Sequence, residues 1–471
     1  MPESRQHHWV TLALLATAAL SFAVMQTLVI PALPFFRREF GASQADTTWI
    51  VTGFLLSSSV LTPLLGKLGD MHGKKRMLVV CLGVFGLGSL GAATADSLGW
   101  IVACRVLQGT GAAVFPLSFG IIRDEFPAER VGVAVGIVSS VFGAGGGIGL
   151  VSSGFILEHL SWQWLFLLGA APVLAACFLI AVCVPESPVR QGGRPDWLGA
   201  LTLSAALVSL LLAVTKGSAW GWGSWGVVAL FFGAVCGFCV WVSVERRVPE
   251  PLVDLRTFAR RGMASTNAAT MLVGFSLTAF FVLMPAFVQV PGGAAGYGFG
   301  ASPAKAGLFF IPTSLAMIVC GPVAGALGTR YGHALALRVG LVASSSAFVL
   351  LAFAHADRWL ALVWMGLLGI GIAFALAAIG TLVLEHSAAS ETGVASGVNM
   401  IMRTIGAAVG AQVAAAVISA HTAAGSLVPG ESGFTIAFAL AAAAAGLAVV
   451  PAAGLGRRRL GGWRRAALSP A

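Results

Sequence analysis

The sequence PLLGKLGDMHG at residues 63–73 occurs again, in altered form, as PVAGALGTRYG at residues 322–332. The prolines and most glycines keep their places, and Gly66 and Gly325 lie 259 residues apart. Later glycines continue the repeat at offsets of 260 and then 261 residues: Gly109, Gly111 and Gly120 match Gly369, Gly371 and Gly380, and Gly132, Gly136, Gly145 and Gly149 match Gly393, Gly397, Gly406 and Gly410. This nearly constant offset predicts two homologous halves.

Composition indicates where these halves reside. Of the 471 residues, 58% are hydrophobic and 10% are charged, and mean hydropathy is +0.91. An average soluble protein has about 25% charged residues, so a soluble enzyme, a disordered protein and a secreted disulfide scaffold are excluded. The seven cysteines all fall in apolar runs and predict neither disulfides nor a metal site. We attribute the net charge of +10 to cytoplasmic loops rather than to nucleic-acid binding.

Apolar segments divide the whole chain. Each is long enough for a membrane-spanning helix, and open strands are excluded from hydrocarbon because their backbone groups would be unpaired. We therefore predict an all-α polytopic membrane protein with an N-terminal six-helix half at 1–186, two inserted helices within 187–255, and a C-terminal six-helix half with a basic tail at 256–471. The fourteen segments are approximately 9–34, 48–66, 77–94, 99–122, 131–156, 162–184, 198–215, 225–244, 262–290, 305–327, 335–354, 359–381, 394–420 and 434–454.

Basic residues predict the orientation. If the N-terminus is cytoplasmic and the segments alternate, inside loops and ends hold 21 Lys and Arg residues and outside loops hold five. The remaining two, Arg105 and Arg403, fall inside segments. By the positive-inside rule both termini are predicted to be cytoplasmic. Arginine outnumbers lysine 23 to 5 and Ala and Gly abound, so we expect the plasma membrane of a GC-rich bacterium.

Three motifs carry a family resemblance. GKLGDMHGKKR at 66–76 resembles the loop 2–3 signature of the major facilitator superfamily, and RVLQGTGAA at 105–113 resembles its fourth-helix motif. TWIVTGFLL at 48–56, SWQWLF at 161–166 and the six-two-six layout resemble the 14-span drug:proton antiporter branch. The resemblance implies the major facilitator fold and export of amphipathic compounds by alternating access, coupled to proton entry. It implies no enzyme activity and no cofactor, and we expect a monomer in the bilayer.

The loop signature suggests a gate. Asp70 lies where neighbouring helix ends and Arg123 could accept its charge, and that contact would exist only while the cytoplasmic side is closed. Its repeat partner is Thr329. For Lys74, Lys75 and Arg76 the positive-inside rule alone remains an alternative explanation. The predicted gate comprises Gly66, Gly69, Asp70, Gly73, Lys74, Lys75 and Arg76, with Arg123, Asp124 and Glu125 as cytoplasmic charge partners.

A substrate cavity is predicted between the halves. A buried arginine such as Arg105 costs at least about 2.5 kcal/mol in a bilayer, and its repeat partner is Met365, so the repeat does not require the charge. Arg403 lies nearer the cytoplasmic end, and simple snorkelling to the interface stays open as its explanation. The predicted cavity residues are Gln26, Phe54, Arg105, Gln108, Phe115, Phe142, Asn399 and Arg403, and Phe281 is a further aromatic candidate.

The fifth segment is rich in glycine. Gly145, Gly149 and Gly154 resemble the antiporter motif of the family, although Leu150 replaces the usual proline. Small residues four apart let helices approach closely, which suits a rocking interface or merely tight packing.

Proton coupling lacks its usual residue. Met25 occupies the place where the branch usually has an acid, and no carboxylate lies near a span centre. Two schemes stay open. In one, Asp70, Asp124 and Glu125 carry protons near the cytoplasmic ends; in the other, a protonated substrate or water competes near Arg105 and Gln26.

Three classes of function remain. A proton-coupled exporter of drug-like or natural-product molecules is favoured by the aromatic candidates. A transporter of an anionic metabolite, drawn to Arg105, or a uniporter without proton coupling is the alternative. A membrane enzyme, channel or sensor is disfavoured because the chain has no H-E-x-x-H motif and no acid pair within a span.

Overall fold

The computed structural model describes residues 3–187, 195–292, 296–422 and 428–455. The basic tail at 457–465, and with it part of the evidence for orientation, lies outside the described residues. Within the described residues, fourteen helical segments are long and apolar enough to cross a membrane, which confirms the predicted fold class. A helix satisfies every backbone group within its own segment, as hydrocarbon requires.

The elements follow in chain order. They are α1 (Glu3–Leu28), α2 (Leu33–Glu39), α3 (Gln44–His72), α4 (Lys74–Ala93), α5 (Leu98–Gln108), η1 (Gly109–Ala113), α6 (Val114–Glu125), α7 (Ala128–His159), α8 (Trp164–Cys183), α9 (Trp197–Trp220), α10 (Trp225–Glu245), α11 (Leu255–Ala259), α12 (Arg261–Gln289), α14 (Pro303–Leu308), α15 (Ile311–Tyr331), α16 (His333–Phe353), α17 (Arg358–His386), η2 (Ala389–Glu391), α18 (Thr392–Ala420), α19 (Glu431–Leu447) and α20 (Val449–Ala453).

Several spans are interrupted. The fourth span is α5 and α6 joined by the tighter turns of η1, where the repeated glycines Gly109 and Gly111 pack against Ser57 and Phe85. The tenth span begins with α14 and continues as α15, and the last comprises α19 and α20. Hydropathy predicted each of these as one segment, because such short breaks between helices do not interrupt the apolar run.

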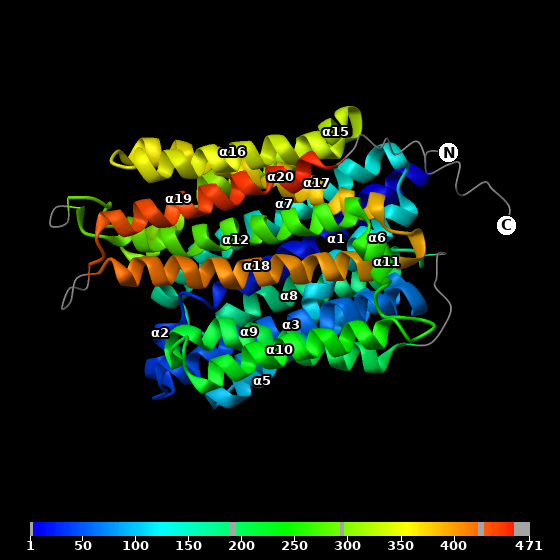
Figure 1. Ribbon diagram of the computed structural model, residues 1–471, viewed down its shortest axis with the longest axis horizontal. Helices are drawn as coiled ribbons and strands as arrows, with labels where there is room; N and C mark the ends of the chain where they lie inside the picture. The colour runs from blue at the N-terminus through cyan, green and yellow to red at the C-terminus, as the bar shows by residue number, and fades with distance from the viewer. Residues whose placement is uncertain (1–2, 188–194, 293–295, 423–427, 456–471) are drawn as a thin grey trace.

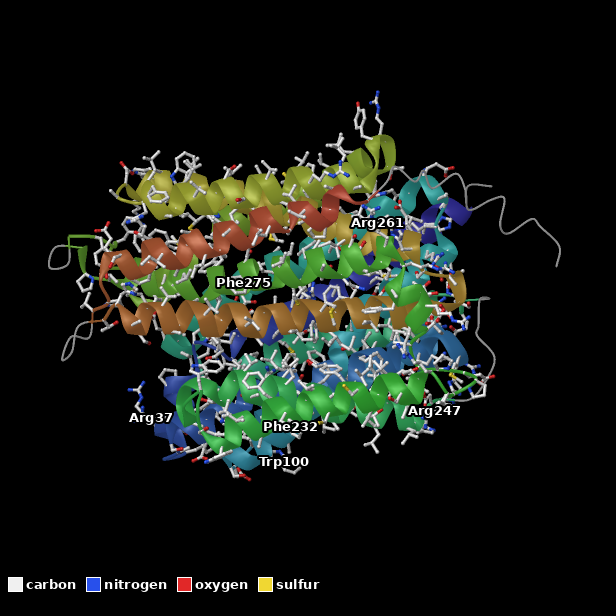
Figure 2. The ribbon with its side chains drawn as sticks, viewed as in Figure 1. Arg37, Trp100, Phe232, Arg247, Arg261 and Phe275 are labelled. Atoms are coloured by element: carbon white, nitrogen blue, oxygen red, sulfur yellow. The ribbon has the colours of Figure 1, made fainter. Side chains whose placement is uncertain are left out.

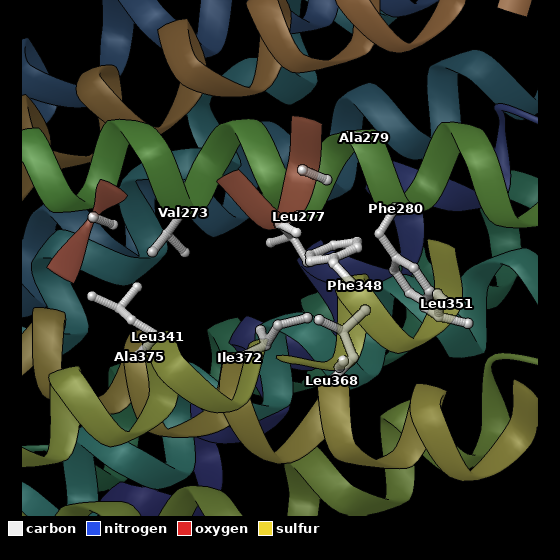
Figure 3. Packing of buried hydrophobic residues seen from close by; sticks show 14 of the residues in the cluster. Val273, Leu277, Ala279, Phe280, Leu341, Phe348, Leu351, Leu368, Ile372 and Ala375 are labelled. Carbon is white, nitrogen blue, oxygen red and sulfur yellow. The ribbon is translucent and has the colours of Figure 1, made fainter. Parts of the chain in front are cut away.

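Two hydrophobic clusters correspond to the two predicted halves. One is formed mainly by side chains of α1 to α8, and the other by side chains of α12 to α20. In the second cluster Phe280 of α12, Phe348 of α16 and Leu368 of α17 pack together (Figure 3). The domain boundaries at residues 186 and 255 stay predictions.

The inserted helices α9 and α10 pack on each other beside α3, along one side of the bundle (Figure 1). α10 is largely exposed, and Phe232 on its outer face is 70% exposed. A third, small cluster joins α9 and the segment around Leu252 to α18 through Val394 and Val398. The insert therefore lies outside the two halves and covers the side of their junction that α3 and α18 form.

The two ends of the bundle differ in charge. The first turn of α1 and the end of α20 lie at the same end, as do Arg247 and Arg261, whereas Arg37 lies at the opposite end (Figures 1 and 2). This arrangement agrees with an even number of spans. The positive-inside rule then assigns the end with Arg247 and Arg261 to the cytoplasm.

We expect topology reporters to reproduce this assignment. A fusion after Pro251 should give a fluorescent, phosphatase-inactive protein, because the positive-inside rule predicts a cytoplasmic loop after α10. A fusion after Gly298, beyond α12, should give active alkaline phosphatase. The same compartment reported by both fusions would contradict the orientation.

Candidate functional site

The two halves meet along two helix seams. α3 contacts α18, and α7 contacts α15. A Cβ atom on Gly66 would lie 2.4 Å from the carbonyl oxygen of Gly393, and one on Gly325 would lie 2.1 Å from that of Gly132. Both seams therefore need glycine, and the repeat relates Gly66 to Gly325 and Gly132 to Gly393. The same backbone contact is thus built twice.

Asp70 joins the halves at the first seam. The side chain is fully buried, and its two oxygens accept hydrogen bonds from the backbone amides of Gly393 and Val394, each at 3.1 Å. These amides belong to the first turn of α18, where helix N–H groups have no partner within the helix and the helix dipole favours an anion. The carboxylate therefore caps a helix of the other half. The prediction that helix ends would accept its charge corresponds to this geometry.

Arg123 makes a second bridge nearby. At the end of α6 its guanidinium donates to the carbonyls of Ser387 and Ala388 at 3.0 and 2.9 Å and to the hydroxyl of Thr392 at 2.9 Å. Ser387 and Ala388 follow α17, and Thr392 begins α18. With Asp70, this residue ties the two halves together at the end of the bundle that is predicted to be cytoplasmic, so the structure is closed on that side.

The turn after α3 is held by charges of the N-terminal half. Gly73 has φ of +114°, a region that favours glycine, and a Cβ there would lie 2.7 Å from the Glu186 carboxylate. That carboxylate accepts from the backbone amides of Lys75 and Arg76 at 3.0 and 3.2 Å. Gly69, by contrast, lies within α3 against Leu117 of α6.

Lys74 is part of a buried ion pair. Its Nζ lies 2.5 Å from Asp124, and both side chains are almost fully buried. Asp124 also accepts from the Ser187 hydroxyl. The neighbouring Glu125 has one buried oxygen without a hydrogen-bond partner among the described residues. Lys74 thus has a structural partner beyond the positive-inside rule, whereas the Arg76 side chain is 72% exposed.

Arg403 lies in a central cavity between the halves. The guanidinium carbon is 4.1 Å from the centre of the Phe142 ring and 6.0 Å from that of Phe115, and these two rings meet edge to face at 5.0 Å. Cation–π contacts of this kind anchor an arginine among aromatic groups. The cavity, of about 40 Å³, is lined by Phe115, Pro116, Phe119, Ser139, Phe142, Thr270, Leu376, Ile379, Gly380, Ser396, Asn399, Met400 and Arg403. Arg403 therefore faces the interior rather than snorkelling.

Two other predicted cavity residues lie close by. Asn399 donates to Asn267 and to the Thr270 hydroxyl of α12, both at 2.8 Å. Gln26 lines a second cavity of about 20 Å³ between α1, α3 and α18, together with Thr404. Binding sites for drug-sized molecules are about 300–1,000 Å³, so the halves must move before such a ligand could enter either cavity.

Arg105, Gln108 and Phe54 form a separate group. The Arg105 guanidinium stacks on Phe54 at 4.1 Å, donates to the Ile50 carbonyl at 3.2 Å and binds the Gln108 side-chain oxygen at 2.7 Å. Arg105 is 1% exposed and lines neither of the two cavities. The structure therefore places these three residues in the packing of α3 against α5.

The glycines of α7 lie on two faces of the helix, one packed against α1 and the other against α15. Gly145 and Gly149 pack against Ala23 and Thr27 of α1, within one half. Gly154 is half-buried on the same helix. The glycines at the seam with α15 are instead Gly132, Gly136, Gly143 and Gly147. Met25 is buried too, against Ser89 and Gly169 of the same half.

One larger cavity was not anticipated. It measures about 550 Å³ and lies at the end of the bundle that is predicted to be cytoplasmic, where the segment between α10 and α12 crosses α3 and α18. Lys67 Nζ donates to the Pro251 carbonyl there at 3.3 Å, and Glu245 binds Trp241 and the amide of Val253. This segment has no motif of its own, so only its tertiary contacts reveal it.

Comparisons with known proteins agree with this architecture. The sequence profile described as Major Facilitator Superfamily matches residues 15–411. The tetracenomycin C resistance and export protein of Streptomyces glaucescens is 29% identical over 87% of this chain and 76% of its own length. The methyl viologen resistance protein of Salmonella typhimurium is 30% identical over 85% and 81%. The human organic anion transporter MFSD10 has a similar fold, with a TM-score of 0.68 at 16% identity over 95% of this chain and 99% of its own.

Asp70→Asn should reduce transport about tenfold or more while membrane insertion stays normal. An asparagine offers one acceptor oxygen and sets its own N–H₂ against an amide donor, and hydrogen bonds to a charged group contribute about 1.5–3 kcal/mol. Initial rates in membrane vesicles, normalised to protein, test this. Thr329→Ala is the matched control because the Thr329 hydroxyl donates to the Gly325 carbonyl of its own helix at 3.0 Å. Equal losses in both variants would refute a special role for Asp70.

Arg105→Met should destabilise the protein by about 1–3 kcal/mol, since the Gln108 oxygen and the Ile50 carbonyl lose a buried donor. Methionine is the residue at the equivalent position of the second half, Met365. Thermal melting in detergent and ligand dissociation constants separate the two roles. A normal melting temperature together with much weaker ligand binding would contradict the packing role and indicate that Arg105 binds substrate.

Proposed function

The chain belongs to the major facilitator superfamily, and we propose that it is a secondary active transporter that exports amphipathic small molecules across the plasma membrane by alternating access. The superfamily and the fold rest on the profile match and the architecture. Direction and substrate class are supported by relatives named for resistance and export. Both termini on the cytoplasmic side and a monomeric state are part of the same proposal.

The central cavity carries this proposal. Phe115 and Phe142 from one half and Arg403 from the other face each other at the junction. Aromatic faces bind flat apolar or cationic molecules, and the guanidinium already shows the mode of contact that a cationic ligand would use. A ligand that inserts between Phe142 and Arg403 would separate residues of opposite halves, so its binding would favour a change in their relative position.

Alternating access is supported by the nature of the cytoplasmic contacts. Asp70 and Arg123 bind groups of the other half, so these bonds must break when the cytoplasmic side opens. Lys74 and Asp124, in contrast, bind within one half and can persist. The gate therefore consists of the hydrogen bonds of Asp70 and Arg123, next to the close glycine contacts. Two rigid halves can form and break these contacts as they move.

Proton coupling is proposed to act through carboxylates near the cytoplasmic ends. A proton on Asp70 would remove the charge that the amides of Gly393 and Val394 stabilise, and would weaken the closed state. Glu125 is a second candidate because one of its oxygens is buried without a partner among the described residues. The competing scheme near Arg105 and Gln26 receives less support, since Arg105 lies in helix packing away from the cavities.

A second function is favoured by one observation. Arg403 places a guanidinium in the central cavity, and an organic anion would be drawn to it. On this alternative the substrate is an anionic metabolite. A uniporter would differ from both in showing no dependence on a pH gradient.

Purified protein in liposomes should move methyl viologen or another aromatic cation faster when a pH gradient is imposed. Phe142→Ala should lower that rate about 2- to 30-fold, which corresponds to the roughly 0.5–2 kcal/mol of a cation–π contact. Phe232→Ala, on the exposed face of α10, is the control and should retain the wild-type rate. Faster movement of organic anions than of cations would select the alternative substrate, and a rate that ignores the pH gradient would select a uniporter.

A further inference from the structure

The buried ion pair of the N-terminal half has a counterpart in the C-terminal half. His333 lies 259 residues after Lys74, the offset that relates Gly66 to Gly325. Glu385 lies 260 residues after Glu125, the neighbour of Asp124, at the offset that relates Gly120 to Gly380 in the same helices. The Nδ1 atom of His333 is 2.9 Å from Glu385 Oε1, and the two side chains are 2% and 5% exposed. The repeat has thus replaced a permanently charged lysine with a histidine, whose charge changes between about pH 5 and pH 8.

The imidazole lies directly at the second seam. His333 begins α16 immediately after Gly332, whose φ of +103° matches that of Gly73 in the first half. Its Nε2 atom lies close to two glycines that have no side chain of their own. A Cβ atom added to Gly132 of α7, or to Gly328 of α15, would be 2.9 Å from this nitrogen. The ring therefore lies where α7 and α15 of opposite halves approach most closely.

The proton count decides the charge of this pair. The pair of Lys74 and Asp124 has no net charge. The pair of a neutral His333 and an ionised Glu385 has a net charge of −1, and it becomes neutral when it binds one proton. Without that proton the pair is a buried anion, and an uncompensated buried charge is strongly unfavourable. We propose that His333 and Glu385 form a proton-binding site, and that the bound proton stabilises the closed contact between α7 and α15 at the cytoplasmic end.

The surrounding charged groups leave this pair isolated. On α15 Arg330 is exposed and stacks on Tyr331, and on α16 Arg338 binds carbonyls at the end of α20. On α17 His386 bonds to the Leu382 carbonyl and faces Gly262 of α12. On α7 the charged residues of the first turn are Glu129, which is exposed, and Arg130, which is half-buried. Within the part of the chain that the structure describes, Glu385 is the ionic partner of His333.

The pair is also joined to the first gate. Glu385 is two residues before Ser387, whose carbonyl accepts from Arg123 of the other half. Movement of the end of α17 would therefore affect both seams. Because the closed state binds the extra proton, its stability should fall as the cytoplasmic pH rises. On the proposed function, on which this regulatory role rests, the proton on this pair would stabilise the α7–α15 contact, whereas a proton on Asp70 would weaken the α3–α18 contact.

Hydrogen exchange of the protein in nanodiscs tests the site without transport. In wild type, peptides covering 128–140 of α7 and 325–335 around the α15–α16 turn should exchange faster as pH rises from about 5.5 to about 8. After correction for intrinsic exchange, one linked proton allows at most about a tenfold change in opening per pH unit. In His333→Lys, which copies the first half, this dependence should disappear.

Two further variants keep the test decisive. Glu385→Gln removes the buried anion by a different change, and should also abolish the rise of exchange with pH even if His333→Lys fails to fold. His355→Gln removes a histidine that pairs with Glu431 at 2.9 Å, in the loop after α16 at the opposite end, and should retain the wild-type response. A corrected response equal to wild type in both His333→Lys and Glu385→Gln, or none in wild type, overturns the proposal. If wild type exports its substrate normally in liposomes at the same time, the proposed function stands and only this inference fails.

Discussion

Close backbone contact between glycines determines how the two halves fit together. At Gly66 with Gly393, and again at Gly132 with Gly325, even one added carbon atom would overlap a carbonyl group. In a bilayer, helices gain little by hiding apolar surface from lipid, so association depends on close packing and on polar bonds. The glycine contacts bring the Asp70 carboxylate within hydrogen-bond distance of the amides at the start of α18. The contacts that Asp70 and Arg123 make across the halves rely on that approach.

The duplicated architecture explains why the two seams behave differently. One copy places Asp70 and Lys74 at the end of a helix pair, and the other places Thr329 and His333 at the equivalent points. The first seam is therefore bound across the halves by a carboxylate at a helix N-terminus. Among the described residues, the second has glycine contacts, a hydrogen bond from the Ser314 hydroxyl to the Ala144 carbonyl, and a histidine–carboxylate pair beside them. The two seams have the same backbone packing but different charged residues. The α3–α18 seam therefore holds the halves together through Asp70, whereas the α7–α15 seam is the one proposed to respond to protons.

Hydropathy sufficed to predict the fourteen spans. The repeat pointed to the two halves and to a gate at Asp70 and Gly73, which stay predictions. These are consequences of chain-local properties: segment length, charge and a turn that needs glycine. The partners could not be predicted, because the contact of Asp70 with Gly393 joins residues 323 positions apart. Arg105 and Arg403 show the same limit. Both are single charges in apolar segments, and only the rotation of each helix decides that Arg105 faces α3 whereas Arg403 faces the cavity.

The position of Arg403 has a further explanation in the repeat. It lies 261 residues after Phe142, the offset that also relates Gly132 to Gly393, so the two residues occupy equivalent positions in the two halves. Equivalent positions come into contact only close to the axis that relates the halves, and here the guanidinium lies 4.1 Å from the Phe142 ring. Two arginines at this point would repel each other, and two phenylalanines would provide no charge. If the two halves were identical, the same residue would stand at both positions and a cation–π pair could not form. Because the halves differ here, one has Phe142 and the other Arg403, and these two residues form such a pair. In a transporter built by duplication, residues that differ between the halves can form contacts near the axis that two identical halves could not form.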